Sequence, residues 1–79
     1  MKFKNKVLTR NSVKKFPEGQ LLVYFNDDDD CYFGLLHWRE DNVATFWSYK
    51  ENRHWEIESW NRYYPVSEDE YVLCRLENE

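Results

Sequence analysis

Residues 21–38 read LLVYFNDDDDCYFGLLHW, and this stretch decides the fold. Residues 21–25 form an apolar run with the length of a buried strand, and residues 31–38 are apolar at both alternating sets of positions. Asn26 and four adjacent Asp residues separate the two runs. Because neighbouring carboxylates repel one another, this segment is predicted to be a solvated turn. Two strands joined by a short turn predict an antiparallel hairpin.

More strands are predicted downstream of this hairpin. Residues 43–49 and 54–60 are rich in β-forming side chains and follow short polar turns, and residues 71–76 are assigned as the last strand. Residues 3–8 are considered as a weak sixth strand. Sequential strands with short turns predict a mainly β fold, an antiparallel meander of five to six strands that forms a highly twisted sheet or a small barrel.

Two local features refine this picture. Gly34 interrupts a strand, where a glycine marks a bulge or the close approach of another backbone. The best candidate for a helix is a single acidic turn within residues 65–72, where the side chain of Ser67 can cap the first turn.

The length of 79 residues indicates one domain over residues 1–79 with a thin core, since a chain of this size buries only about 60% of its unfolded surface. Four Trp, six Tyr and five Phe supply large side chains for that core. The first fifteen residues hold no apolar run longer than Val7-Leu8, and no stretch has the length of a membrane span. Cys31 and Cys74 are 43 positions apart, so we expect two reduced, buried thiols in a cytoplasmic protein.

Charge is distributed unevenly along the chain. Residues 1–15 carry six Lys or Arg and no acid, whereas residues 16–79 carry five Lys or Arg and all 15 acids. The first segment is therefore a basic N-terminal arm or a weak first strand, followed by an acidic body. An acidic body repels nucleic-acid phosphates and attracts basic surfaces. It also serves solubility, and the basic segment can pair with it inside the same fold.

No pattern of a catalytic, cofactor or metal site stands out. The candidate metal ligands Cys31, His37, His54 and Cys74 are isolated residues, whereas structural zinc sites use closely spaced pairs. The Asp run lacks the alternating spacing and central glycine of a calcium loop. We therefore expect no cofactor, no metal and no enzymatic activity.

Two segments are predicted to contact a partner. The connection around residues 60–64 combines aromatic side chains with an arginine, the residue types that dominate binding hot spots, and the acidic turn can engage a basic surface. The alternative for the first segment is a strand continuation whose aromatic rings cap the barrel. The candidate partner-binding residues are Asp27, Asp28, Asp29, Asp30, Trp60, Arg62, Tyr63 and Tyr64.

The order of certain residues resembles small phage and prophage domains of unknown function. They are Leu22-Val23-Tyr24, Gly34-Leu35-Leu36-His37-Trp38, and Trp60 followed by Pro65. That family places its proline closer to the tryptophan, in a Pro-Leu-Pro element that this chain lacks. In size and acidity the chain is also similar in style to phage inhibitors of host defence, including anti-CRISPR and anti-restriction proteins. No functional residues carry over from this resemblance.

Two functions follow as expectations. The first is a non-enzymatic, phage-type (anti-CRISPR-like) inhibitor that binds a host protein, such as one that binds nucleic acid, through acidic turns and exposed aromatic side chains. The second is a small β-barrel that binds single-stranded nucleic acid through Lys2, Lys4, Lys6 and the aromatic strands. No membrane association is expected. Exposed edge strands are compatible with a homodimer.

Overall fold

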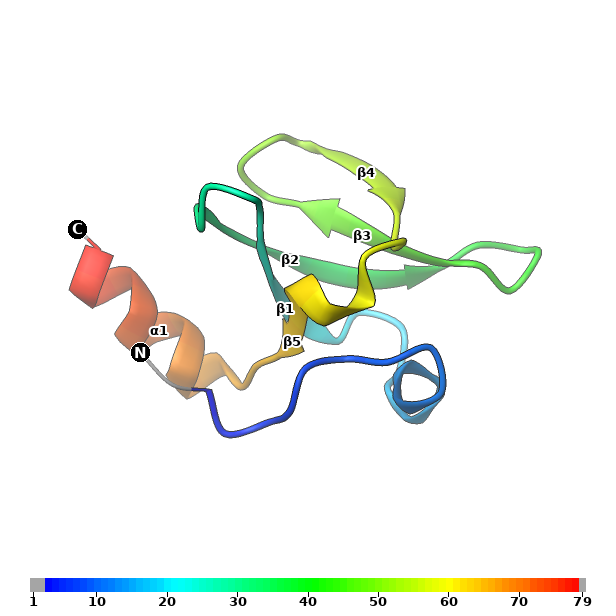
Figure 1. Cartoon of the computed structure of the whole chain (residues 1–79), viewed down its shortest axis with the longest axis horizontal. Coiled ribbons are helices and arrows are strands. Elements are labelled where there is room, and N and C mark those ends of the chain that lie inside the picture. Colours follow the sequence, from blue (N-terminus) through cyan, green and yellow to red (C-terminus); the bar gives the residue numbers. More distant parts are fainter. Residues whose placement is uncertain (1–2, 79) are drawn as a thin grey trace.

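A computed structural model describes residues 3–78 and shows a five-stranded antiparallel sheet with one C-terminal helix (Figure 1). The order of the strands across the sheet is β4-β3-β2-β1-β5. Strands β1 to β4 form the predicted meander, and β5 pairs with the outer side of β1. The sheet stays open instead of closing into a barrel. The strands are β1 (Leu21–Phe25), β2 (Cys31–Trp38), β3 (Ala44–Ser48), β4 (Arg53–Glu56) and β5 (Tyr63–Pro65).

The first hairpin has the predicted bounds, and the next two strands are shorter than predicted. Strand β3 begins at Ala44 and ends at Ser48. Strand β4 begins at Arg53 and ends at Glu56, after which the chain leaves the sheet. The N–H of Ile57 still donates to the carbonyl of Ala44, at 3.1 Å, but its side chain turns into the core and is 3% exposed.

The strand predicted over residues 71–76 is wrong, because this segment lies within helix α1 (Glu68–Asn78). A reciprocal cap starts the helix. The backbone N–H of Glu70 donates to Ser67 Oγ, at 3.2 Å, and the N–H of Ser67 donates to Glu70 Oε1, at 2.9 Å. Ser67 was correctly identified as the cap, but the helix runs for 11 residues and not for one turn.

The fifth strand is β5, in the connection that was expected to lie between strands. No strand forms near residues 3–8; instead this segment runs beside β5 and covers its outer edge. The N–H of Leu8 donates to the carbonyl of Tyr63, at 2.8 Å, and Asn5 Nδ2 donates to the carbonyl of Pro65, at 3.0 Å. This edge is therefore closed to further pairing.

One face of the sheet carries the core. The N-terminal segment, with the 3-10 helix η1 (Ser12–Lys15), packs Leu8 and Val13 onto this face, where both are almost fully buried. Tyr24 lies at the centre of an aromatic cluster, with its ring centroid 4.8 Å from that of Tyr63. Because so many rings gather here, a thin domain obtains a large apolar contact area.

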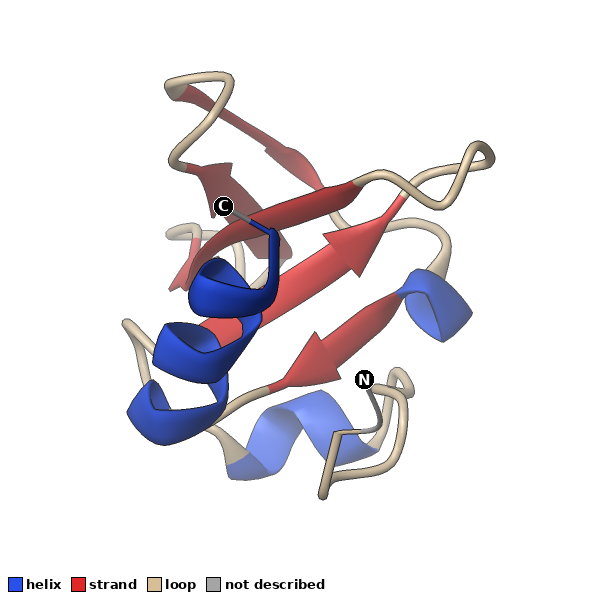
Figure 2. Ribbon diagram, turned by 90° about the vertical axis from the view of Figure 1, so that its left-hand side faces the viewer, coloured by secondary structure: helices blue, strands red, loops and turns tan. Residues whose placement is uncertain are grey.

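Helix α1 lies across the opposite face of the sheet (Figure 2). The ring of Tyr71 packs edge-on against that of Phe33, with centroids 4.8 Å apart. The helix covers only the end of this face near the turn between β1 and β2. The remainder of the face, with Leu35 and Trp47, is only partly buried.

Candidate functional site

The acidic turn joins β1 to β2, and all four of its aspartates are exposed. Asn26 shapes this turn, since its Oδ1 accepts hydrogen bonds from the N–H groups of Asp28, at 3.0 Å, and Asp30, at 2.8 Å. Arg62 reaches the turn from the 3-10 helix η2 (Trp60–Arg62). Its Nη2 lies 3.1 Å from Asp27 Oδ1, and its Nη1 donates to the carbonyl of Asn26, at 3.0 Å. The structure thus brings the two predicted contact segments together.

The aromatic residues of the second segment are largely used for packing. Tyr63 is 2% exposed and lies in the core, where its hydroxyl accepts a hydrogen bond from Trp55 Nε1, at 2.8 Å. Burial raises the pKa of Tyr63 to about 12. Tyr64 is on the opposite face and packs against Phe3 and Phe25. Tyr63 therefore offers no surface to a partner, and Tyr64 offers little.

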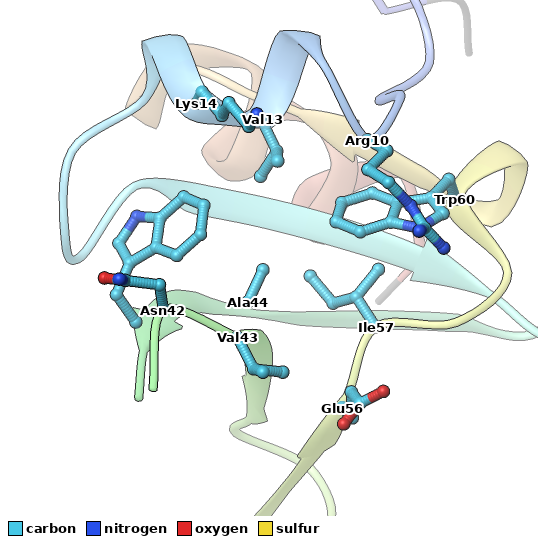
Figure 3. Close-up of a pocket in the computed structure, with 10 residues that line it drawn as sticks. Arg10, Val13, Lys14, Asn42, Val43, Ala44, Glu56, Ile57 and Trp60 are labelled. Carbon is cyan, nitrogen blue, oxygen red and sulfur yellow. The ribbon is translucent and has the colours of Figure 1, made fainter. Parts of the chain in front are cut away.

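Trp60 lines a pocket of about 240 Å³ on the core face, between η1 and the segment that follows β4 (Figure 3). Ala44 and Ile57 form an apolar floor, and Arg10 lies beside the Trp60 indole. The indole N–H of Trp60 is buried without a hydrogen-bond partner in the described part of the chain. The pocket combines apolar and aromatic walls with the cations of Arg10 and Lys14 and the carboxylate of Glu56. Its lining residues are Arg10, Val13, Lys14, Trp38, Asn42, Val43, Ala44, Glu56, Ile57 and Trp60.

Exposed apolar surface gathers on α1. Val72, Leu73 and Leu76 are 53%, 52% and 67% exposed, and they lie on the side of the helix that faces away from the sheet. Together with Asp69 they follow the i, i+3, i+4, i+7 spacing of a stripe along one helix face. Tyr49 is 47% exposed, and its ring centroid lies 6.4 Å from that of Tyr71 on the same helix. We refer to Val72, Leu73 and Leu76 as the apolar stripe; Tyr49 lies beside the helix, next to Tyr71 of its inner face.

Sequence reasoning missed this stripe because residues 71–76 were assigned to a strand. In a strand, Val72 and Leu76 share a face with Cys74, which is buried. The capping pair Ser67 and Glu70 is the signal that identifies the helix, and with it the outward position of the stripe.

A groove of about 330 Å³ lies on the part of the sheet that α1 leaves uncovered. Its floor is Leu35 and Trp47, and its rim carries His37 and His54, whose ring centroids are 6.2 Å apart. His37 Nδ1 lies 2.7 Å from Glu18 Oε2. The backbone N–H of Trp38 and the His37 side chain lower the pKa of Glu18. This pair fixes the orientation of one imidazole, but no hydroxyl or thiol lines the groove.

The basic N-terminal arm is folded against the sheet, and its cations remain at the surface. Among the described residues, no ion pair involves Lys6, Arg10, Lys14 or Lys15. Lys2 lies outside the described residues. Arg10 and Lys14 line the Trp60 pocket on the core face, whereas α1 begins with exposed Glu68 and Asp69.

Within residues 3–78, no three side chains of His, Cys, Asp or Glu come close enough together to hold a metal ion. The helices in the same residues are too short or too polar to cross a membrane. No protein-family model, curated protein or solved structure matches this chain.

Proposed function

We propose that this chain is a non-enzymatic protein-binding domain that docks through the apolar stripe. The observation that carries the proposal is the location of the exposed large apolar side chains on the described surface, all of which lie on α1 or against it. The inner face of α1, with Tyr71 and Cys74, already packs against the sheet. The apolar side chains of the outer stripe are therefore not needed to hold the helix in place. Contiguous exposed apolar surface of this kind is typical of interaction sites.

The charges around the stripe support a partner with a basic surface. Glu68 and Asp69 are exposed at its beginning, and Asp30 directly precedes Cys31, whose side chain contacts α1 through Cys74. An apolar stripe beside these acids fits a partner surface with an apolar centre and a basic rim. Basic rims of this kind are found on nucleic-acid-binding proteins. We therefore assign the partner to this class, which agrees with a phage-type inhibitor that covers such a surface on a host-defence protein.

The test compares wild type with the double variant Leu73→Asp/Leu76→Asp as bait in a lysate of the host cell. Wild type is expected to retain a protein that the variant loses at least about tenfold, because two carboxylates would be buried in an apolar contact. The control is Lys15→Asp, which changes the net charge by the same amount at an exposed site on the other side of the molecule. The control is expected to retain the same protein as wild type.

Two further measurements define the outcome. First, if the chain covers the nucleic-acid-binding surface of the partner, it should displace a labelled oligonucleotide from the purified partner. Equal retention by wild type and the double variant would overturn the proposal. So would sedimentation of the free chain as a dimer that the double variant dissociates, because the stripe would then be covered by a second copy.

A second candidate function is binding of single-stranded nucleic acid at the Trp60 pocket. Arg10 and Lys14 line this pocket together with Trp38 and Trp60, and cations beside aromatic rings are the combination that such sites use. Fluorescence anisotropy of labelled oligonucleotides at about 50 mM salt tests it. Binding to wild type that Arg10→Glu/Lys14→Glu abolishes and Leu73→Asp/Leu76→Asp preserves would favour this function over the first. No binding at that salt concentration would exclude it.

A further inference from the structure

Two thiols meet between the sheet and the helix. Cys31 is the first residue of β2, and Cys74 lies on the inner face of α1. The two thiols lie close enough to each other to interact. Both were predicted to be buried; Cys74 is 4% exposed, but Cys31 is only half-buried.

The spacing of the two elements explains this contact. Tyr71 packs on Phe33, and from there three residues along α1 lead to Cys74, a rise of about 4.5 Å. Two residues back along β2 lead from Phe33 to Cys31 on the same face of the sheet, a distance of about 6.6 Å. Both cysteines therefore lie in the layer between β2 and α1, where Phe33 and Tyr71 are also in contact.

An oxidant in solution can reach this pair through Cys31. The thiol lines an open pocket together with Lys50 from the turn between β3 and β4 and with Tyr71 and Arg75 from α1. Burial, and next the Cys74 thiol, raise the pKa of Cys31 to about 12, while the charge of Lys50 lowers it. Cys31 is therefore a thiol at neutral pH, and its oxidation needs either mildly alkaline conditions or a strong oxidant.

We propose that Cys31 and Cys74 form a reversible disulfide that cross-links α1 to β2. The oxidant is a low-molecular-weight disulfide such as oxidised glutathione. In the first step, one cysteine thiolate attacks a sulfur of glutathione disulfide, forms a mixed disulfide and releases one glutathione thiolate. In the second step, the other cysteine attacks the protein sulfur, the protein disulfide forms and the second glutathione leaves. Two protein thiols lose two protons and two electrons, and one glutathione disulfide is reduced to two glutathione molecules.

The cross-link would act on the least secured element of the fold. An isolated helix of 11 residues is marginal in water, so α1 depends on its contacts with the sheet. Apart from the thiol pair, those contacts include the Tyr71 ring on Phe33 and the hydrogen bond from the Lys4 N–H to Glu70 Oε2, at 2.9 Å. A disulfide fixes the middle of the helix and also prevents α1 from separating from the sheet. If the proposed function holds, oxidation therefore keeps the apolar stripe in its docking position.

The experiment incubates the full chain with oxidised glutathione at about pH 8.5, where thiolates are more populated, and follows the intact mass. The expected product is a monomer lighter by two hydrogen atoms, which dithiothreitol returns to the starting mass. Its melting temperature should rise by about 10 °C or more, because the bond closes a long loop. Hydrogen exchange of the α1 amides should slow by about tenfold or more relative to the reduced chain.

Cys31→Ser and Cys74→Ser are the matched variants. Cys74→Ser keeps the accessible Cys31 and is expected to stop at the mixed disulfide with glutathione, whereas Cys31→Ser keeps only the buried Cys74 and is expected to remain unmodified. Melting temperatures of the reduced variants show whether they fold. A wild-type product that stays a mixed disulfide, or that becomes a disulfide-linked dimer, would overturn the proposal. An unchanged mass would also overturn it. These readouts involve no partner, so they are independent of the failure or success of the protein-binding function.

Discussion

At the scale of single residues, Gly34 is the position in the sheet that least tolerates a side chain. A Cβ atom added there would collide with the backbone carbonyl oxygen of Trp47 and lie 2.8 Å from Phe46 Cζ. The carbonyl belongs to β3, which pairs with β2, so it cannot move away without disturbing the ladder. We expect Gly34→Ala to lower the free energy of unfolding by about 3 kcal/mol, measured by urea denaturation.

Gly19 supplies the control for this prediction. Its φ is +84°, and an added Cβ would meet nothing within 4 Å. Gly19→Ala therefore strains the backbone without a collision and should cost about 1 kcal/mol. A smaller loss of stability at Gly34 than at Gly19 would contradict the close approach of β2 and β3.

Glu70 makes stability depend on pH. Its burial tends to raise the pKa, but hydrogen bonds from the N–H groups of Ser67 and Lys4, together with the Ser67 side chain, lower it below the usual 4.5. Because the folded pKa is depressed, the ionised carboxylate stabilises the fold above about pH 4.5, and this stabilisation is lost as the pH falls through the folded pKa. Glu70→Gln keeps the shape of the side chain and removes the charge.

We expect Glu70→Gln to be less stable than wild type by about 1 kcal/mol near pH 6, and the difference to shrink towards zero near pH 3. Urea denaturation of both proteins at the two pH values measures this difference. A difference that stays constant with pH would mean that the ionised carboxylate has no special role in the cap.

At the scale of elements, α1 has two apolar faces with different roles. Tyr71 on the inner face packs against Phe33, so Tyr71→Ala should lower the free energy of unfolding by about 2 kcal/mol. Leu73 on the outer face is 52% exposed, and Leu73→Ala should change it by less than about 0.5 kcal/mol. Chemical denaturation of the two variants measures both values. A large loss in Leu73→Ala would show that the stripe belongs to the fold and not to a docking surface.

The strands that the sequence predicts best are those with strong local signals. The bounds of β1 and β2 agree with the prediction because the Asp run and the two flanking apolar runs leave little choice of turn. Residues 71–76 have no such signal. Five of their six side chains are apolar, so the segment satisfies a helical and a strand pattern equally well. The cap at Ser67 and the packing of Tyr71 decide in favour of a helix.

Strand β5 lies partly within residues 60–64, where a strand continuation was the alternative to a contact segment, but it pairs with β1 and does not extend β4. Pro65 has no N–H to donate to a neighbouring strand, but it is the last residue of an edge strand, and its carbonyl accepts a hydrogen bond from Asn5 Nδ2. The candidate contact residues were placed with mixed success. Asp27 and Arg62 form an ion pair at the surface, whereas Tyr63 is in the core. The sequence does not reveal the burial of Tyr63, because a tyrosine in a short strand gives no sign of which face of the sheet is covered.

At the scale of the whole molecule, the N-terminal arm is a structural layer as well as a concentration of charge. Figure 1 shows the blue segment passing along the β5 side of the sheet to η1. Leu8 is 1% exposed and Val13 is 2% exposed, and Phe16 packs against the same core cluster. Burial of three such side chains contributes roughly 5–9 kcal/mol, which is comparable with the total stability of a small domain.

Deletion of residues 1–16 should therefore unfold the protein, although it removes no strand of the sheet and none of the ion pairs described above. Circular dichroism and the loss of a cooperative urea transition would report it. The control replaces Lys6, Lys14 and Lys15 by Gln, which removes charge from exposed positions and leaves the three apolar side chains in place. This control should unfold cooperatively, within about 1 kcal/mol of wild type. If the deletion variant folds as well as the control, the core does not depend on this layer, and the arm acts through its charge alone.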